Sequence, residues 1–195
     1  QVRISLVLEA VSKEEKVKVA QKDIDAEMQK MADNYKMELD KVKELLLSKK
    51  LSALKNMYDY ILIDCPPALG VIIDNALYAS DSVIIPVECS FYAYDALTQM
   101  VNKIDEIQKE KPLEIEGILL TKLDNRNTIG YNIVEKVKFE FPFKTFNTII
   151  SVSSHIQEAP MYGKSVIQFS YNSRGSKEYR DLAKEILEGT NNEWL

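Results

Sequence analysis

The chain has 195 residues and a formal net charge of −5 at pH 7, and 46% of its residues are hydrophobic and 28% are charged. This composition is typical of a globular protein with one domain and an appendage, and the negative charge argues against a general attraction to DNA phosphates. No apolar run approaches the roughly 18 residues of a membrane span, so the sequence predicts a cytoplasmic protein that does not bind the membrane.

The first 49 residues differ in composition from the rest of the chain. They contain no Gly and no Pro, and they are rich in Lys, Glu, Met and Leu. Ile24, Met28, Met31 and Tyr35 recur with the spacing of one helical face. We therefore expect an all-helical appendage over residues 1–49, whose apolar stripes serve either core packing or the binding of another protein segment.

From residue 58 onward, short apolar runs alternate with longer amphipathic stretches. The runs predict strands over residues 60–63, 82–87, 115–120 and 145–150, and the stretches predict helices near residues 72–79, 93–110, 129–140 and 176–188. Apolar strands that alternate with helices indicate an α/β domain over residues 50–195, with a doubly wound parallel sheet covered on both faces. Cys65 and Cys89 each follow an apolar run, which predicts reduced thiols in the core of a cytosolic protein.

Asp64 ends the first apolar run of this domain. Ligands of doubly wound sheets bind beyond the carboxyl ends of the strands, so Asp64 stands where a carboxylate can orient a Mg²⁺ contact. Pro66 and Pro67 follow at once and would stiffen the turn. The alternative interpretation is that Asp64 only caps the next turn or helix.

Several blocks of the sequence form an ordered set of motifs, at residues 58–67 (YDYILIDCPP), 75–77, 79–87, 92–93, 115–121, 158–160, 163–164, 173–175 and 179–186. These blocks resemble one known family, the ParA/Soj/MinD group of deviant P-loop ATPases. They occur in the order and with the spacing of the family over about residues 50–188. The resemblance implies an incomplete sheet of the P-loop NTPase type. It also implies an ATP- and Mg²⁺-dependent homodimer that binds DNA non-specifically, responds to a centromere-binding partner protein and segregates chromosomes or plasmids.

The same resemblance assigns roles to single residues. Asp64 would be the Mg²⁺-linked carboxylate, and Thr121 would lie where the contacts to the base begin. Pro160 and its neighbours would correspond to the loop near the adenine. The switch beside Asp64 would consist of Cys65, Pro66 and Pro67.

The phosphate side of the family's site has no counterpart in these 195 residues. Family members start with a strand, a Gly-rich loop that contains two lysines, and a second Asp-containing strand. The only Gly-Lys-Ser, at residues 163–165, has Glu158 where a P-loop needs its first Gly, and residues 166–169 look extended instead of helical. We therefore expect no ATP hydrolysis by the 195 residues alone, and it stays open whether a phosphate loop precedes Gln1.

Two further departures concern DNA and membranes. The family commonly has Pro-Arg-Asn-x-Arg where this chain has Ser-Val-Ser-Ser-His at residues 151–155, so the resemblance does not carry DNA binding over. A basic patch and a solvated helix face remain alternatives for Lys122, Arg126, Lys136 and Lys138. The last eight residues are polar and acidic, unlike the basic amphipathic helix of the membrane-attached branch.

Residues 1–47 resemble a different protein family. Residues 2–11, 23–28 and 31–35 are similar to the carboxyl-terminal, client-binding domain of trigger factor, a ribosome-associated chaperone. This resemblance implies a chaperone-like binding function, and it leaves a gene fusion, a chimera and an assembly artefact open. A third alternative is a pseudo-ATPase that pairs with a complete ParA-type subunit.

Overall fold

The computed structural model describes residues 47–48, 51, 54–65 and 70–188. The chain divides into two compact units, one that ends at Ser80 and one that begins at Asp81. The helical segment expected over residues 1–49 lies almost entirely outside the described residues, and its boundary with the next domain stays a prediction. No helix among the described residues is long and apolar enough to span a bilayer.

In the first unit, the strand predicted at residues 60–63 does not form. Tyr60 is 61% exposed and Leu62 is 81% exposed, and no other described segment pairs with them. A strand needs a hydrogen-bonded neighbour, and the apolar composition of this run did not reveal whether one is present. The helix expected next is confirmed as α4, Val71–Ala79.

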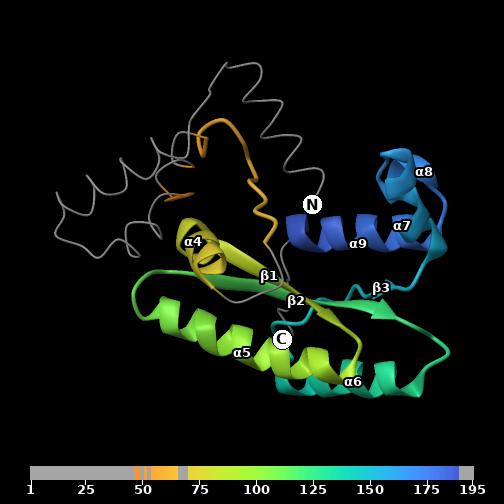
Figure 1. The fold of residues 1–195 in the computed structure, drawn as a ribbon, viewed down its shortest axis with the longest axis horizontal. Helices are drawn as coiled ribbons and strands as arrows, with labels where there is room; N and C mark the ends of the chain where they lie inside the picture. Colours follow the sequence, from red (N-terminus) through yellow and green to blue (C-terminus); the bar gives the residue numbers. More distant parts are fainter. Residues whose placement is uncertain (1–46, 49–50, 52–53, 66–69, 189–195) are drawn as a thin grey trace. The chain divides into compact units, whose positions relative to one another are not determined.

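The second unit is built on a three-stranded sheet in the order β1–β2–β3, with all strands parallel (Figure 1). Its strands are β1 (Ser82–Glu88), β2 (Glu114–Leu123) and β3 (Ile150–Ser151). The expected strands at 82–87 and 115–120 are confirmed. The backbone N–H of Cys89 bonds to the carbonyl of Thr121 at 2.9 Å, so odd-numbered residues at this end of β1 face β2. Pro86, which has no N–H, therefore faces away from β2.

β3 is shorter than the strand predicted over residues 145–150. Thr145 forms only an isolated bridge with Ile118. The backbone N–H groups of Asn147 and Thr148 donate to the Glu185 carboxylate at 2.6 and 3.0 Å instead of joining the ladder. A side chain from a helix has thus replaced strand pairing at these residues.

Helices cover both faces of the sheet. Figure 1 shows α5 and α6 on one face and α9 on the other. The helical elements of this unit are α5 (Phe91–Gln108), α6 (Thr128–Glu140), α7 (Ser154–Glu158), the 3₁₀ helix η1 (Ala159–Tyr162), α8 (Val166–Phe169) and α9 (Arg174–Glu188). The helices predicted at 93–110, 129–140 and 176–188 are confirmed within a few residues at each end. Asn127 caps α6, because its side-chain oxygen accepts the Ile129 N–H at 2.9 Å.

β2 lies at the centre of the core. Ile118 and Leu120 are completely buried and point to one face, while Leu119 points to the other. Leu119 belongs to a buried cluster with Phe146, Ile150 and Leu182, which joins the sheet to α9. Burial on both faces confirms the covered sheet expected from the apolar strands.

The extended structure predicted for residues 166–169 is wrong. These residues form α8, and Ser165 and Gln168 make a capping box in which the Gln168 N–H donates to Ser165 Oγ and the Ser165 N–H donates to Gln168 Oε1, each at 3.2 Å. The Ser-x-x-Gln spacing is a helix-start signal in the sequence. It outweighed the β-branched residues Val166 and Ile167.

The outer edge of β3 is held by a carboxylate of α9. Glu178 accepts the Ser151 N–H at 2.9 Å and the Ser151 hydroxyl at 2.8 Å. Arg174 donates to the same carboxylate through Nε at 2.7 Å. Charge-assisted bonds of this kind are stronger than neutral ones, so α9 fixes the position at which β3 ends.

Replacement of Gly117 by Ala should destabilise the protein, because an added Cβ would lie 2.3 to 2.7 Å from ring atoms of Phe146, which is fully buried. We expect a loss of about 1–3 kcal/mol in the free energy of unfolding, measured by urea denaturation. The matched control is Gly70→Ala, where an added Cβ meets nothing within 4 Å. Equal stability of the two variants would contradict this account of the core.

Glu178→Gln should also lower stability, because the neutral amide weakens the bonds from Ser151 and Arg174. We expect a loss of about 1.5–3 kcal/mol in the free energy of unfolding. Glu158→Gln, at an exposed position at the end of α7, serves as the control. Hydrogen exchange at the Ser151 amide should accelerate in Glu178→Gln alone, and unchanged exchange would rule out the proposed hold on β3.

Candidate functional site

The carboxyl edge of the sheet brings three loops of the second unit together. β1 ends at Glu88, β2 at Leu123 and β3 at Ser151. Pairing continues past the last strand, since the Val152 N–H donates to the Leu123 carbonyl at 3.0 Å. A main-chain bond therefore holds the segments after β2 and β3 side by side at this edge.

Thr121 lies at this edge, as expected from the sequence. It pairs with Glu88 of β1 on one side and with Ile150 of β3 on the other. Its side chain is half-buried, and its hydroxyl donates to the Val87 carbonyl at 3.2 Å. Because the proton points to Val87, the hydroxyl oxygen keeps lone pairs that can accept a hydrogen bond from a ligand.

The next residue, Lys122, has a left-handed backbone with φ of 54°, and the register of β2 and β3 shifts between Thr121 and Leu123. A bulge of this kind redirects a side chain. Here it turns Lys122 toward Glu88, with which it forms an ion pair across the ends of β1 and β2.

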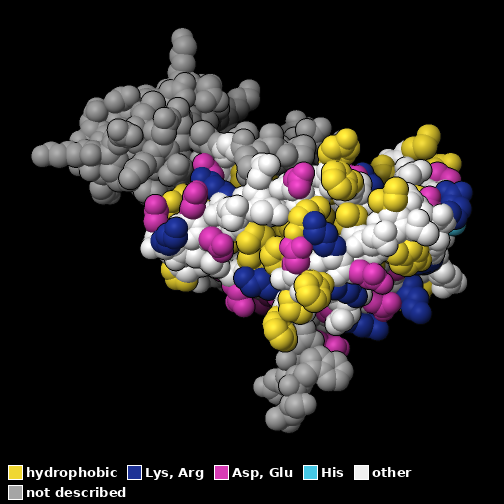
Figure 2. Space-filling model, turned by 90° about the horizontal axis from the view of Figure 1, so that it is seen from below, with side chains coloured by type: hydrophobic (Ala, Val, Ile, Leu, Met, Phe, Trp, Pro, Cys, Tyr) yellow, Lys and Arg dark blue, Asp and Glu magenta, His cyan; other side chains and the backbone are white. Residues whose placement is uncertain are grey.

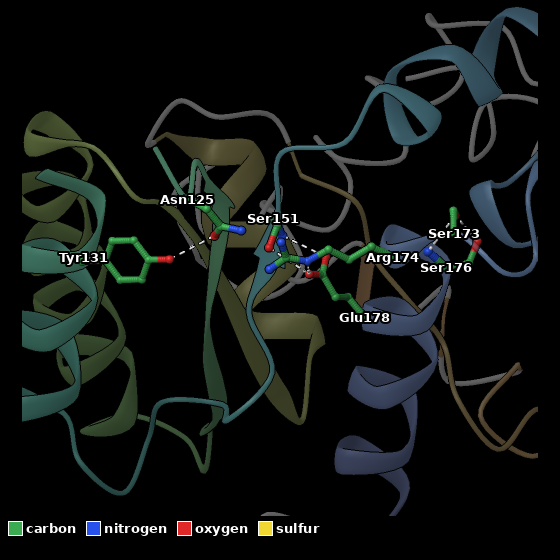
Figure 3. Close-up of polar contacts among 7 residues, drawn as sticks. All are labelled: Asn125, Tyr131, Ser151, Ser173, Arg174, Ser176 and Glu178. Carbon is green, nitrogen blue, oxygen red and sulfur yellow. Dashed lines mark hydrogen bonds and ion pairs between the residues drawn. The ribbon is translucent and has the colours of Figure 1, made fainter. Parts of the chain in front are cut away.

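The loop after β2 is held by its own side chains. Asp124 accepts the Arg126 backbone N–H at 3.0 Å, and its two oxygens accept Nε and Nη2 of Arg126 at 3.0 and 2.9 Å. The Arg126 side chain, followed by its backbone N–H, holds the pKa of Asp124 at about 2. Farther along, the Tyr131 hydroxyl donates to Asn125 Oδ1 at 3.1 Å (Figure 3). This leaves the Asn125 amide group as an oriented donor.

The basic patch considered for Lys122, Arg126, Lys136 and Lys138 does not assemble. Lys122 and Arg126 are paired with acidic groups, and Lys136 lies 3.5 Å from the centre of the Tyr94 ring. Figure 2 shows both signs of charge interspersed on the face that carries α5 and α6. The solvated helix face is the better description of these residues.

Beyond β3, the structure brings a cationic group to a place where the sequence showed none. Figure 3 shows Arg174 extending along Glu178 to Ser151 at the carboxyl end of β3. The Arg174 side chain is 58% exposed and that of Glu178 is 14% exposed. The spacing of four residues on one helix signals this ion pair in the sequence. The contact between Glu178 and Ser151 joins residues 27 positions apart, so no local sequence pattern predicts it.

Pro160 lies in the segment that follows β3. It is exposed and occupies one of the first two positions of η1, where its missing N–H costs nothing. Its carbonyl accepts the Gly163 N–H at 3.0 Å, and Gly163 has a φ of 62°. Residues 163–165 thus follow helical turns and not a strand. A P-loop connects a strand to a helix. Residues 163–165 precede a helix, α8, but they follow η1 instead of a strand, and for this reason they are not a P-loop.

Asp64 and Cys65 belong to the first unit, and both are exposed. Partial burial of the thiol and the charge of Asp64 raise the pKa of Cys65 above its ordinary value. The expectation of a core thiol is therefore wrong for Cys65. Cys89 is half-buried, and burial raises its pKa to about 11. Pro66 and Pro67 lie outside the described residues.

A comparison with protein families matches residues 4–117 to AAA_31, an AAA domain. The match covers more than half of the chain. The match starts at residue 4 and so includes most of residues 1–47, the segment that resembles a different family. The resemblance of that segment to trigger factor stays a prediction.

Curated relatives point the same way. The sporulation initiation inhibitor protein Soj of Bacillus subtilis (strain 168) is 47% identical over 146 residues, which is 74% of this chain and 58% of Soj. The chromosome partitioning protein ParA of Myxococcus xanthus is 39% identical over 147 residues, which is 74% of this chain and 52% of ParA. The chain thus spans little more than half the length of the curated relatives it matches.

Solved structures agree on the fold. Cobyrinic acid a,c-diamide synthase from Mycobacterium smegmatis, with a bound ATP analogue and magnesium, has a TM-score of 0.63 and 26% identity, and the match covers 77% of this chain and 56% of that one. McdA from Cyanothece in complex with ATP has a TM-score of 0.65 at 22% identity, over 75% of this chain and 58% of that one. The family match and the curated relatives show that the chain belongs to the AAA_31 family, with Soj and ParA among its relatives, and the parallel sheet agrees with the P-loop NTPase type of fold.

Proposed function

We propose that this chain supplies the magnesium side and the base side of the ATP site of a ParA-type partition protein. The observation that carries the proposal is the parallel sheet, whose carboxyl edge holds Thr121 near the end of β2 and leads beyond β3 into the segment that reaches Pro160. Ligands of such sheets bind at this edge. The solved relative with a bound ATP analogue and magnesium supports adenosine nucleotides as the ligand, and the names of the ParA relative and of the plasmid partition protein from Borrelia burgdorferi support chromosome or plasmid segregation as the process.

On the magnesium side, Asp64 is an exposed carboxylate followed by Cys65, Pro66 and Pro67. Among the described residues, no group of three or more His, Cys, Asp or Glu side chains could hold a metal ion. A single carboxylate suits Mg²⁺, which takes few protein ligands and keeps its bonds to water and substrate phosphates. Bound magnesium would neutralise phosphate charge, and Asp64 would orient it.

On the base side, the geometry of Thr121 favours adenine. Its hydroxyl proton is donated to Val87, so the oxygen is an acceptor for the ligand. Adenine offers the hydrogen atoms of its exocyclic amino group, whereas guanine has a carbonyl oxygen at the same ring position. The turn at Pro160 would border the base.

The 195 residues alone should not hydrolyse ATP. Catalysis of phosphoryl transfer depends on positioning and on charge stabilisation around the γ-phosphate. The sequence holds no Gly-rich loop with lysines that could provide either. Dimerisation, a centromere-binding partner and DNA binding would then belong to the assembled partition protein.

Phosphate release by the purified chain with ATP and Mg²⁺ should therefore equal the rate without protein. Binding of ATP, followed by NMR titration, should be weak and should lose its Mg²⁺ dependence in Asp64→Ala. Asp59→Ala, from the same segment, is the control and should bind like the parent chain. Magnesium-dependent hydrolysis that disappears in Asp64→Ala alone would refute the predicted inactivity.

Thr121→Val removes the hydroxyl and keeps the shape of the side chain. We expect its affinity for adenosine nucleotides to fall by about tenfold, the value of one hydrogen bond, while guanosine nucleotides are unaffected. Thr121→Ser should keep the preference. The same titrations measure both, and an unchanged preference in Thr121→Val would remove Thr121 from the base site.

A further inference from the structure

We propose that Glu88 selects ribonucleotides by accepting a hydrogen bond from a ribose hydroxyl, and that Lys122 holds the Glu88 carboxylate in position for it. The inference rests on the proposed nucleotide site, because it places the sugar of the ligand beside a base at Thr121. All three residues belong to the second unit.

Glu88 and Thr121 project from the same face of the sheet. They are register partners, and the pairing of β1 with β2 runs without a shift from Ile84 to Glu88. Side chains alternate along a strand, so Glu88 lies on the face of Ile84, and Thr121 lies on the face of Leu119. Ile84 packs against the buried cluster that includes Leu119, so the two faces are the same. Since neighbouring strands are about 5 Å apart, Glu88 and Thr121 stand side by side.

The Glu88 carboxylate has one oxygen that a ligand can use. Lys122 Nζ donates to Oε1, and no donor among the described residues reaches Oε2. The Glu88 side chain is 52% exposed, so Oε2 is accessible. A carboxylate accepts hydrogen bonds and donates none, and its partner must therefore carry an O–H or N–H group. Because Lys122 directly follows Thr121 in the chain, the ion pair keeps the carboxylate near the candidate base contact.

The backbone of Lys122 indicates that the ion pair serves a ligand. In the described part of the chain, Lys122 is the only residue other than glycine with a positive φ. This conformation costs energy for a residue with a Cβ. The ion pair is exposed, with 67% of the Lys122 side chain accessible, and such pairs contribute little stability. Strained residues that stability does not explain are concentrated at ligand sites.

The chemistry of Glu88 fits the sugar of a nucleotide better than its phosphates. The negative charge of the carboxylate would repel phosphate oxygens, whereas a ribose hydroxyl is an uncharged donor. Acidic side chains beyond strand ends bind ribose hydroxyls in dinucleotide-binding sheets. A hydrogen bond from a hydroxyl to a carboxylate is charge-assisted and therefore stronger than a neutral one. Loss of the ribose hydroxyls should thus lower affinity at this site.

The test compares adenosine with 2′,3′-dideoxyadenosine on the complete chain by NMR titration. Neither nucleoside carries phosphates, so the comparison does not depend on a phosphate loop. We expect adenosine to bind the parent chain about tenfold more tightly, the value of one hydrogen bond to a charged group. Glu88→Ala should bind both nucleosides equally. Glu88→Gln keeps an oxygen acceptor without the charge and should retain part of the preference.

Two further variants separate the role of Glu88 from general effects of charge. Glu114→Ala removes an exposed glutamate at the start of β2, at the opposite edge of the sheet, and should keep the full preference for adenosine. Lys122→Met breaks the ion pair and leaves the carboxylate in the chain. We expect it to lower the preference for the ribose hydroxyls while the preference for adenosine over guanosine stays unchanged. Thermal melting verifies that the variants fold.

The outcomes distinguish this inference from the proposed function. Equal binding of adenosine and dideoxyadenosine to the parent chain, with adenosine still preferred over guanosine, would overturn the role of Glu88 and leave the nucleotide site standing. An unchanged preference in Glu88→Ala, or an equal loss in Glu114→Ala, would also overturn that role. Absence of nucleoside binding would overturn both the role of Glu88 and the proposed site.

Discussion

The carboxylates of α9 are the contact on which the rest of the second unit depends. Glu178 and Glu185 lie seven residues apart on one face of the helix and accept backbone N–H groups from residues 147–151. Those residues have little strand pairing of their own. The two side chains therefore determine where the chain leaves the core, how β3 meets β2, and where the segment toward Pro160 begins.

The candidate site likewise depends on the core of the second unit, because β2 connects the two. β2 passes through the core at Leu119 and reaches the edge at Thr121, where the ladder on both sides is still intact. Immediately afterwards the bulge at Lys122 shifts the register, β2 ends at Leu123, and the next loop is held by the bonds between Arg126 and Asp124. The polar groups at the edge are thus supported by core packing instead of by mobile loops.

The predictions from the sequence were most accurate where the spacing of the apolar residues reflects which side chains are buried. The strands at 82–87 and 115–120 and the long helices were predicted correctly, and Thr121 lies near the end of its strand as expected. The strand prediction for residues 60–63 was wrong because apolar composition carries no information about a pairing partner. The prediction of extended structure for residues 166–169 was wrong because it did not take the capping box at Ser165 into account. The Ser151–Glu178 contact joins distant residues, and only the folded chain reveals it.

The two edges of the sheet differ in what they allow. On the β3 side, Glu178 accepts the outward N–H of Ser151, so this donor is not available to another strand. On the β1 side, Pro86 faces outward without a donor, so a strand laid alongside must leave one of its carbonyls to water. At these two positions the outer strands of the described sheet therefore offer no free main-chain donor, which limits where another strand could pair with them.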